Sequence, residues 1–178
     1  MTGGINLILG CMFSSKTSTL ISRYNRYSIG GKKCIMIKYK NDVRYDPFRV
    51  VTHDGIKVEA IVCNLLAEVD TKIQNYDVIC VDEVQFYKDA DIYLDKWAND
   101  GKIIEACGLN GDYNRKPFDV ISQLIPKVEN ITFLKAICKN NGNDAVFSKR
   151  LINSNKQELI GGENIYEAVD RETFFINR

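Results

Sequence analysis

The chain has 178 residues, of which 45% are hydrophobic and 26% charged, with only three prolines. This composition is typical of one globular domain with a core of its own and excludes a disordered or fibrous chain. Lysine and arginine total 24 against 23 aspartates and glutamates, and this net charge of +1 argues against a nucleic-acid-driven ATPase and against a protein that binds membrane surfaces.

The first element predicted along the chain is a phosphate-binding loop. Residues 10–17 read Gly-Cys-Met-Phe-Ser-Ser-Lys-Thr, between an expected strand at 5–9 and an expected helix at 17–29. In a strand–loop–helix, main-chain N–H groups and the helix N-terminus form an anion nest. Lys16 would add a positive charge and Thr17 a hydroxyl for Mg²⁺. The nucleotide-binding candidates are Gly10, Cys11, Met12, Phe13, Ser14, Ser15, Lys16 and Thr17.

One position departs from the phosphate-loop pattern Gly-x-x-x-x-Gly-Lys-[Ser/Thr]. Ser15 stands where the second glycine is expected. If the backbone there is left-handed, a serine costs about 1–2 kcal/mol relative to glycine. A strand–turn–helix without nucleotide is the alternative interpretation of this segment.

The remaining elements alternate short apolar runs with helical segments. A polar loop is expected at 41–54, and Gly30-Gly31 should stop the first helix. This alternation is typical of βαβ units, so the sequence predicts an α/β fold with a mostly parallel sheet and flanking helices, like that of phosphate-loop NTPases. We expect a kinase-like core at 1–137 and a small subdomain at 138–178. The expected strands are 34–37, 58–62, 78–81, 103–107 and 131–137, and the expected helices are 65–73, 89–99 and 118–125.

Six cysteines occur without a short repeated spacing, and Cys34, Cys80 and Cys107 lie inside apolar runs. This pattern suits a reducing compartment better than a disulfide framework. Residues 1–4 carry no basic region, and no apolar run approaches the roughly 18 residues of a membrane helix. We expect a soluble, cytoplasmic protein.

Two carboxylates follow the apolar run at 78–81. Asp82 has the usual position of the Mg²⁺-organising aspartate of phosphate-loop proteins, at the end of a strand. Because ligands of open α/β sheets bind beyond the carboxyl ends of the strands, both acids should face the phosphate loop. Glu83 could then accept a proton from an attacking hydroxyl. The alternative is that the two acids only cap a helix.

Aromatic residues form a third candidate group. Scattered aromatics are more often core than ligand contacts, but Tyr113 and Phe118 lie in a polar loop where a planar base would suit them. Arg44 and Arg115 are candidate clamps for phosphate or carboxylate, with ordinary surface charge as the alternative. His53, the only histidine, has no second histidine or nucleophile beside it, so we do not expect catalysis from it. Trp97 is expected in the core.

Together these motifs resemble the type II thymidine kinases, of the cellular and poxviral kind. The resemblance covers nearly the whole chain, and the length is similar to that of the poxviral members. It rests on motifs in the same order: Gly10–Thr17, Ile37-Lys38-Tyr39, Asp42-Val43-Arg44-Tyr45, Thr52-His53-Asp54, Val81–Phe86, Leu109–Phe118, Phe147-Ser148-Lys149-Arg150 and Ile160-Gly161-Gly162 with Tyr166.

The resemblance implies transfer of the ATP γ-phosphate to the 5′-hydroxyl of thymidine, in nucleotide salvage for DNA synthesis. It implies ATP and Mg²⁺ as cofactors, a homotetramer with a homodimer as the alternative, and a C-terminal lasso loop over the base. The implied catalytic residues are Glu83, Lys16 and Arg44, and Thr17 and Asp82 would bind Mg²⁺, partly through water. The implied thymidine contacts are Met12, Phe86, Leu109, Tyr113, Phe118, Ser148, Gln157, Leu159 and Tyr166.

Members of this family usually tie the lasso to the core with a zinc held by two Cys-x-x-Cys pairs. Here only Cys138 remains, since its partner position is Asn141 and the second pair reads Asp170 and Thr173. One thiolate cannot form a tetrahedral structural site, so structural zinc is expected to be absent. Packing, for example by Phe174 and Phe175, would then hold the lasso.

Two functions therefore stay open at the level of the sequence. The first is an active deoxynucleoside kinase, supported by Lys16-Thr17, Asp82-Glu83 and the base-pocket residues. The second is a degenerate homologue that binds nucleotide or a protein partner with little turnover, suggested by Ser15 and by the missing zinc ligands. Phosphate transfer to thymidine would distinguish the two.

Overall fold

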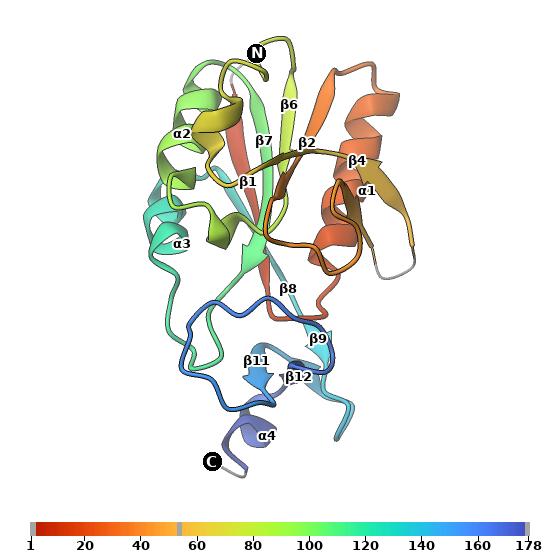
Figure 1. The fold of residues 1–178 in the computed structure, drawn as a ribbon, viewed down its shortest axis with the longest axis vertical. Helices are drawn as coiled ribbons and strands as arrows, with labels where there is room; N and C mark the ends of the chain where they lie inside the picture. Colours follow the sequence, from red (N-terminus) through yellow and green to blue (C-terminus); the bar gives the residue numbers. More distant parts are fainter. Residues whose placement is uncertain (1–2, 53–54, 177–178) are drawn as a thin grey trace.

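A six-stranded parallel sheet forms the centre of the molecule (Figure 1). The computed structural model describes residues 3–52 and 55–176. The strand order is β5-β2-β6-β7-β1-β8, and every pair of neighbours is parallel. The predicted α/β class with a parallel sheet is therefore confirmed. The strands are β1 (Gly4–Gly10), β2 (Cys34–Tyr39), β5 (Ile61–Cys63), β6 (Val78–Val81), β7 (Ile103–Leu109) and β8 (Asn130–Leu134).

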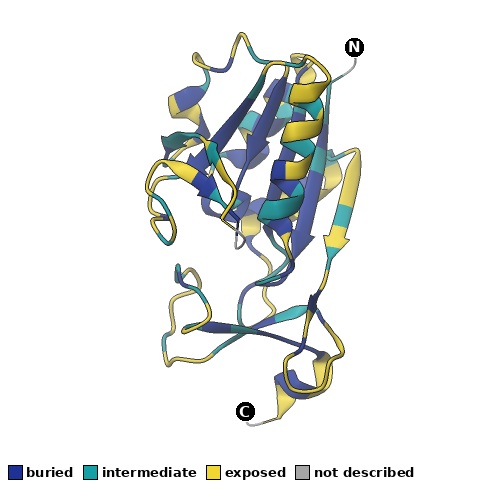
Figure 2. Cartoon of the chain, turned by 90° about the vertical axis from the view of Figure 1, so that its right-hand side faces the viewer, coloured by how far each residue is buried: buried dark blue, intermediate teal, exposed yellow. Residues whose placement is uncertain are grey.

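Helices cover both faces of this sheet (Figure 1). α1 (Lys16–Ile29) lies on one face, while α2 (Ala90–Asn99) and α3 (Asp119–Leu124) lie on the other. Successive residues of a strand point to opposite faces, so Leu7 packs in the cluster with α2 and Ile8 in the cluster with α1. Trp97 of α2 is fully buried, as predicted. The central strands are buried on both sides, as Figure 2 shows.

The sequence misplaced the connections between β2 and β6. The polar loop at 41–54 contains β3 (Arg49–Val51), which pairs with β4 (Lys57–Glu59), so the strand predicted at 58–62 is divided between β4 and β5. The helix predicted at 65–73 is only the short 3₁₀ helix η1 (Leu66–Val69). Asp70 instead accepts hydrogen bonds from Trp97 and Lys96 of α2, and these tertiary contacts outweigh the local helical pattern.

The last predicted strand, 131–137, is also divided. β8 follows β1 only as far as the pair Gly10–Leu134, because β1 ends there at the phosphate loop. The next residues form β9 (Ala136–Ile137), which pairs with β10 (Asp144–Ala145). Two further 3₁₀ helices occur, η2 (Val84–Phe86) and η3 (Ile125–Lys127).

The C-terminal elements lie beyond the carboxyl ends of the sheet strands (Figure 1). β11 (Phe147–Arg150) pairs with β12 (Tyr166–Val169), and α4 (Arg171–Phe175) follows. Their small core includes Val169 and Phe174, and also Cys11 of the phosphate loop. Residues 151–165 between β11 and β12 have no helix or strand, and we refer to them as the lasso. The division into 1–137 and 138–178 stays a proposal.

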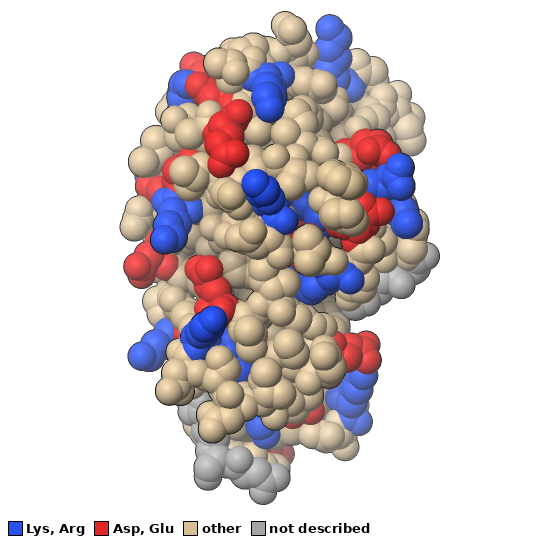
Figure 3. Space-filling view, in the orientation of Figure 1, with Lys and Arg blue, Asp and Glu red and all other residues tan. Residues whose placement is uncertain are grey.

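Charged side chains of both signs are interspersed over the face that Figure 3 shows. This agrees with the net charge of +1. Within residues 3–52 and 55–176, no helix has the length and apolar character that crossing a membrane requires.

Candidate active site

The phosphate loop leaves β1 at Gly10, where only glycine fits. A Cβ there would lie 2.4 Å from Ser14 Oγ and 2.6 Å from the carbonyl oxygen of Leu134. Ser15 has φ 60° and ψ 28°, so the residue before the lysine is left-handed, the conformation that the glycine of the pattern would adopt freely. Ser15 therefore keeps the shape of the loop at a cost in backbone strain.

Lys16 begins α1 and lies inside the loop. Lys16 is only 8% exposed, and its Nζ donates a hydrogen bond to the carbonyl of Cys11 at 2.6 Å. Ser14 Oγ donates to the same carbonyl at 2.8 Å. The ammonium group and the N-terminus of α1 thus face one hollow, which is an arrangement that binds anions.

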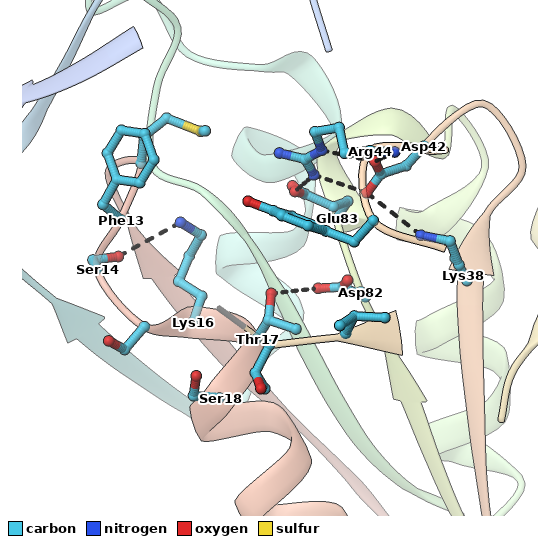
Figure 4. Close-up of a pocket in the computed structure, with 15 residues that line it drawn as sticks. Phe13, Ser14, Lys16, Thr17, Ser18, Lys38, Asp42, Arg44, Asp82 and Glu83 are labelled. Atoms are coloured by element: carbon cyan, nitrogen blue, oxygen red, sulfur yellow. Dashed lines mark hydrogen bonds and ion pairs between the residues drawn. The ribbon is translucent and has the colours of Figure 1, made fainter. Parts of the chain in front are cut away.

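Thr17 and Asp82 meet across the same hollow (Figure 4). Thr17 Oγ1 donates to Asp82 Oδ1 at 3.2 Å, and Cys107 Sγ lies 3.0 Å from the same oxygen. Burial, and then the Glu83 carboxylate, raise the pKa of Asp82 from 3.8 to about 6. A hydroxyl and a carboxylate oxygen are the hard ligands that Mg²⁺ prefers, and a cation there would favour the charged form of Asp82.

Glu83 lies beside Asp82 and is held by Arg44 (Figure 4). Arg44 Nη2 contacts Glu83 Oε1, while Arg44 Nε donates to Asp42 Oδ1 at 2.7 Å. Gln85 Nε2 donates to the other Glu83 oxygen at 2.6 Å. Burial opposes the negative charge of Glu83, but Arg44 and then Lys16 outweigh it and hold the pKa below its usual value. Glu83 is therefore a carboxylate at neutral pH.

A second, less polar hollow adjoins the first. Its lining comes from η2, the end of β7, the start of α3 and the lasso. Met12, Arg44 and Glu83 line both hollows, so the carboxylate of Glu83 lies where the two meet. One molecule could therefore extend from the anion-binding side to the apolar side past this carboxylate. The remaining lining residues are Gln85, Phe86, Leu109, Phe118, Gln157, Glu158, Leu159, Ile160, Gly161 and Tyr166.

Comparison with known proteins agrees with this geometry. A family model described as thymidine kinase matches residues 3–174. The chain belongs to the thymidine kinase family. It is 44% identical over 174 residues to a thymidine kinase of sheeppox virus, covering 98% of each chain. It is 43% identical over 175 residues to thymidine kinase 1 of Dictyostelium discoideum, covering 96% of this chain and 77% of that protein. A vaccinia virus thymidine kinase is 42% identical over 175 residues, with 98% of each chain covered.

Most residues that the family resemblance implies as thymidine contacts lie around the second hollow, but two do not line it. Ser148 accepts a hydrogen bond from the main-chain N–H of Met12 at 2.9 Å. The ring of Tyr113 lies 3.7 Å from the guanidinium carbon of Arg150. Phe118 is 4% exposed and belongs to the core as well as to the lining of the hollow.

Two other polar residues that the sequence analysis considered, Arg115 and His53, are not placed in the site by the structure. Arg115 stacks on Phe147, Phe174 and Phe175, with its guanidinium carbon 4.6–5.6 Å from the ring centroids, and does not line either hollow. Its suggested role as a clamp for phosphate or carboxylate stays a prediction that this geometry does not support. His53 lies outside the residues that the structure describes.

The four positions that correspond to the zinc ligands of the thymidine kinase family form a hydrogen-bonded cluster. Asp170 accepts from Asn141 Nδ2 at 2.8 Å and from the main-chain N–H of Thr173 at 2.8 Å. Asn143 Nδ2 donates to it at 3.1 Å, and Cys138 Sγ lies 3.5 Å from Thr173 Oγ1. An amide nitrogen that donates a hydrogen bond has no lone pair for a metal, so this donor set does not fit a structural zinc.

Sequence reasoning missed three residues that shape the site. Gln85 bonds both Glu83 and, through Oε1 at 3.1 Å, the main-chain N–H of Leu109. Cys107 contacts Asp82, although its apolar neighbours suggested a core residue. Arg150 bonds the lasso. Gln85 and Arg150 lie inside motifs that the sequence analysis recognised, and Cys107 lies just before one, but a motif does not reveal which residue a side chain will contact.

Proposed function

We propose that this protein transfers the γ-phosphoryl group of ATP to the 5′-hydroxyl of thymidine, giving dTMP and ADP for DNA synthesis. The observation that carries the proposal is that the anion-binding hollow and the apolar hollow meet at Glu83. A nucleoside in the apolar hollow would then direct its 5′-hydroxyl towards the phosphates. Membership of the thymidine kinase family supports the same substrates.

On the nucleotide side, we assign the phosphates to the main-chain N–H groups of the loop from Gly10 to Thr17. Lys16 would exchange its bond with the Cys11 carbonyl for β- and γ-phosphate oxygens, which are stronger partners because they are charged. Thr17 and Asp82 fit a Mg²⁺ ion, which supplies charge neutralisation at the phosphates when it is bound. Placing the phosphates and neutralising their charge is most of what phosphoryl transfer requires.

At the junction, Glu83 is assigned as the general base. The O5′–P bond forms as the bond from the γ-phosphorus to its bridging oxygen breaks, and the hydroxyl proton passes to the Glu83 carboxylate. Arg44 orients this carboxylate and also donates to the carbonyl of Gly161 in the lasso at 3.4 Å. The charge that develops on the transferred group would be stabilised by Lys16 and by the guanidinium of Arg44.

On the nucleoside side, the base is assigned to the hollow lined by Met12, Phe86, Leu109 and Phe118. Tyr166 closes that hollow, and its OH donates to the carbonyl of Leu159 at 2.8 Å. Gln157 Nε2 donates to Asp112 at 3.2 Å and ties the lasso to the loop after β7. Ser148 and Tyr113 would support the site through Met12 and Arg150 rather than by lining the hollow.

Three further assignments belong to this proposal. The cluster around Asp170 replaces the family's zinc, because its amide and hydroxyl groups bond one another rather than offer a metal four ligands. A homotetramer, or a homodimer, is proposed from the family alone. A cytoplasmic location is proposed because all six cysteines are free thiols, five of them buried.

Transfer of labelled phosphate from ATP to thymidine tests the function. Glu83→Gln should reduce kcat by about 10²–10⁴-fold, because a positioned base contributes that much, while ATP binding stays within a few-fold of wild type. Glu59→Gln, an exposed carboxylate in β4, is the control and should not change kcat. Wild-type protein that binds ATP without phosphorylating thymidine would instead support the degenerate homologue.

A further inference from the structure

Arg150 is the last residue of β11, and its side chain lies against the lasso. Nη1 donates to the carbonyls of Ser154 at 3.0 Å and Lys156 at 2.5 Å. Nη2 donates to the carbonyl of Gln157 at 3.1 Å and to Tyr166 OH at 2.8 Å. One guanidinium group therefore fixes three carbonyls of a segment that has no helix or strand to hold it.

The same group also contacts two aromatic rings. Its central carbon lies 3.7 Å from the centroid of Tyr113 and 5.3 Å from that of Tyr166. Tyr113 belongs to the loop after β7, and Tyr166 begins β12. Arg150 thus connects the lasso to the core and to the strand that follows the lasso, and cation–π attraction adds to its hydrogen bonds.

The segment that Arg150 fixes carries one wall of the nucleoside hollow. Gln157, whose carbonyl Arg150 bonds, lines that hollow, and so do Leu159 and Gly161, which follow it in the chain. Arg150 itself does not line either hollow. Its action on a bound nucleoside is therefore indirect, through the shape of the lasso.

We infer that Arg150 is a positioning residue that holds the lasso closed over the nucleoside and so sets the affinity for thymidine. The inference rests on the proposed function. Holding the wall in its binding shape lowers the entropy that binding must remove, so loss of Arg150 weakens nucleoside binding more than it slows the chemical step. ATP, which is assigned to the other hollow, is affected less.

The bonding pattern explains why arginine is required. A planar guanidinium presents several donors at fixed angles and can stack on a ring while it donates in its plane. A lysine ammonium keeps the charge but cannot stack flat on Tyr113 and reach the same carbonyls together. Lysine at this position should therefore restore only part of the function.

Steady-state kinetics of Arg150→Met and Arg150→Lys test this role. Losing several charge-assisted hydrogen bonds should raise KM for thymidine about tenfold or more in Arg150→Met, with KM for ATP within about twofold and a smaller loss of kcat. Arg150→Lys should fall between wild type and Arg150→Met. The matched control is Lys149→Met, because Lys149 also donates to two carbonyls, those of Thr173 and Ile176, away from the lasso.

A second measurement does not need the kinase activity. Cleavage after the exposed Glu158 by a glutamate-specific protease reports opening of the lasso, and none of the variants alters that site. Arg150→Met should be cut about tenfold faster than wild type, and Lys149→Met at the wild-type rate. Wild-type protein that fails to phosphorylate thymidine would refute the proposed function, while this measurement would still decide whether Arg150 holds the lasso.

Two results would overturn the inference. One is an unchanged KM for thymidine together with an unchanged cleavage rate in Arg150→Met. The other is an equal increase in the KM values of both substrates with a large fall in Tm, which would make Arg150 a general structural residue.

Discussion

Arg23 of α1 donates to the carboxylate of Glu105 in β7 at 2.7 Å, beneath the helix that follows the phosphate loop. Glu105 is 1% exposed. Its other oxygen accepts from Asn6 Nδ2 at 3.0 Å and from Tyr27 OH at 3.2 Å, and Arg23 Nη2 donates to Thr132 at 2.8 Å. The network connects α1 to three strands, β1, β7 and β8.

Removing only one partner of this buried pair should destabilise the protein strongly. Arg23→Leu leaves a buried carboxylate without its cation, which typically costs about 3–5 kcal/mol. The double variant Arg23→Leu, Glu105→Leu removes both charges and should recover most of that loss. Urea unfolding of the three proteins measures the difference. Equal stability of wild type and the single variant would show that the ion pair contributes nothing.

The left-handed backbone of Ser15 predicts a substitution that stabilises the protein. Ser15→Gly removes the strain of φ 60° and should raise the free energy of unfolding by about 1 kcal/mol, or Tm by about 2–4 °C. The same replacement at Ser18, inside α1, is the matched control. It should lower stability by about 0.5 kcal/mol, because glycine is a poorer helix former than serine. Thermal unfolding that shifts both variants in the same direction would contradict this account.

Local patterns in the sequence were sufficient to predict the central strands of the sheet and the motifs at their carboxyl ends. The run 78–81 followed by Asp82 and Glu83 predicted a buried strand ending in two acids, and β6 ends as expected. The segment 5–29 predicted a strand, a loop and a helix, which β1 and α1 match. These features depend on contacts between residues that are close in the chain.

The rest depends on pairings between distant residues, which one sequence does not reveal. Glu105 interrupts an apolar run, and the cation that it pairs with, Arg23, lies 82 positions away in the chain. Arg44 was recognised as a candidate clamp, but its partner Glu83, 39 positions away, became visible only in the fold. The strand predicted at 131–137 was divided because β1 ends at Gly10, a limit set by the neighbouring strand and not by the segment itself.

The cluster around Asp170 predicts a dependence of stability on pH. Hydrogen bonds from Thr173, Asn143 and Asn141 hold the pKa of Asp170 below its usual value of 3.8. A carboxyl whose pKa is lower in the folded state stabilises the protein fully above the unfolded pKa, and this contribution is lost as the pH falls towards the folded pKa. Asp170→Asn removes the charge that this stabilisation requires.

Thermal unfolding of wild type and Asp170→Asn between pH 7 and pH 3 measures this contribution. The difference in Tm should be largest at about pH 5 and above and should begin to shrink as the pH falls below about 4, the unfolded pKa, towards the lower folded pKa. Because the donor set does not fit zinc, dialysis against a chelator should leave the Tm of wild type unchanged at pH 7. A Tm difference that is constant with pH would contradict the role of the carboxylate, and a chelator-induced fall in Tm would show that a metal holds this cluster.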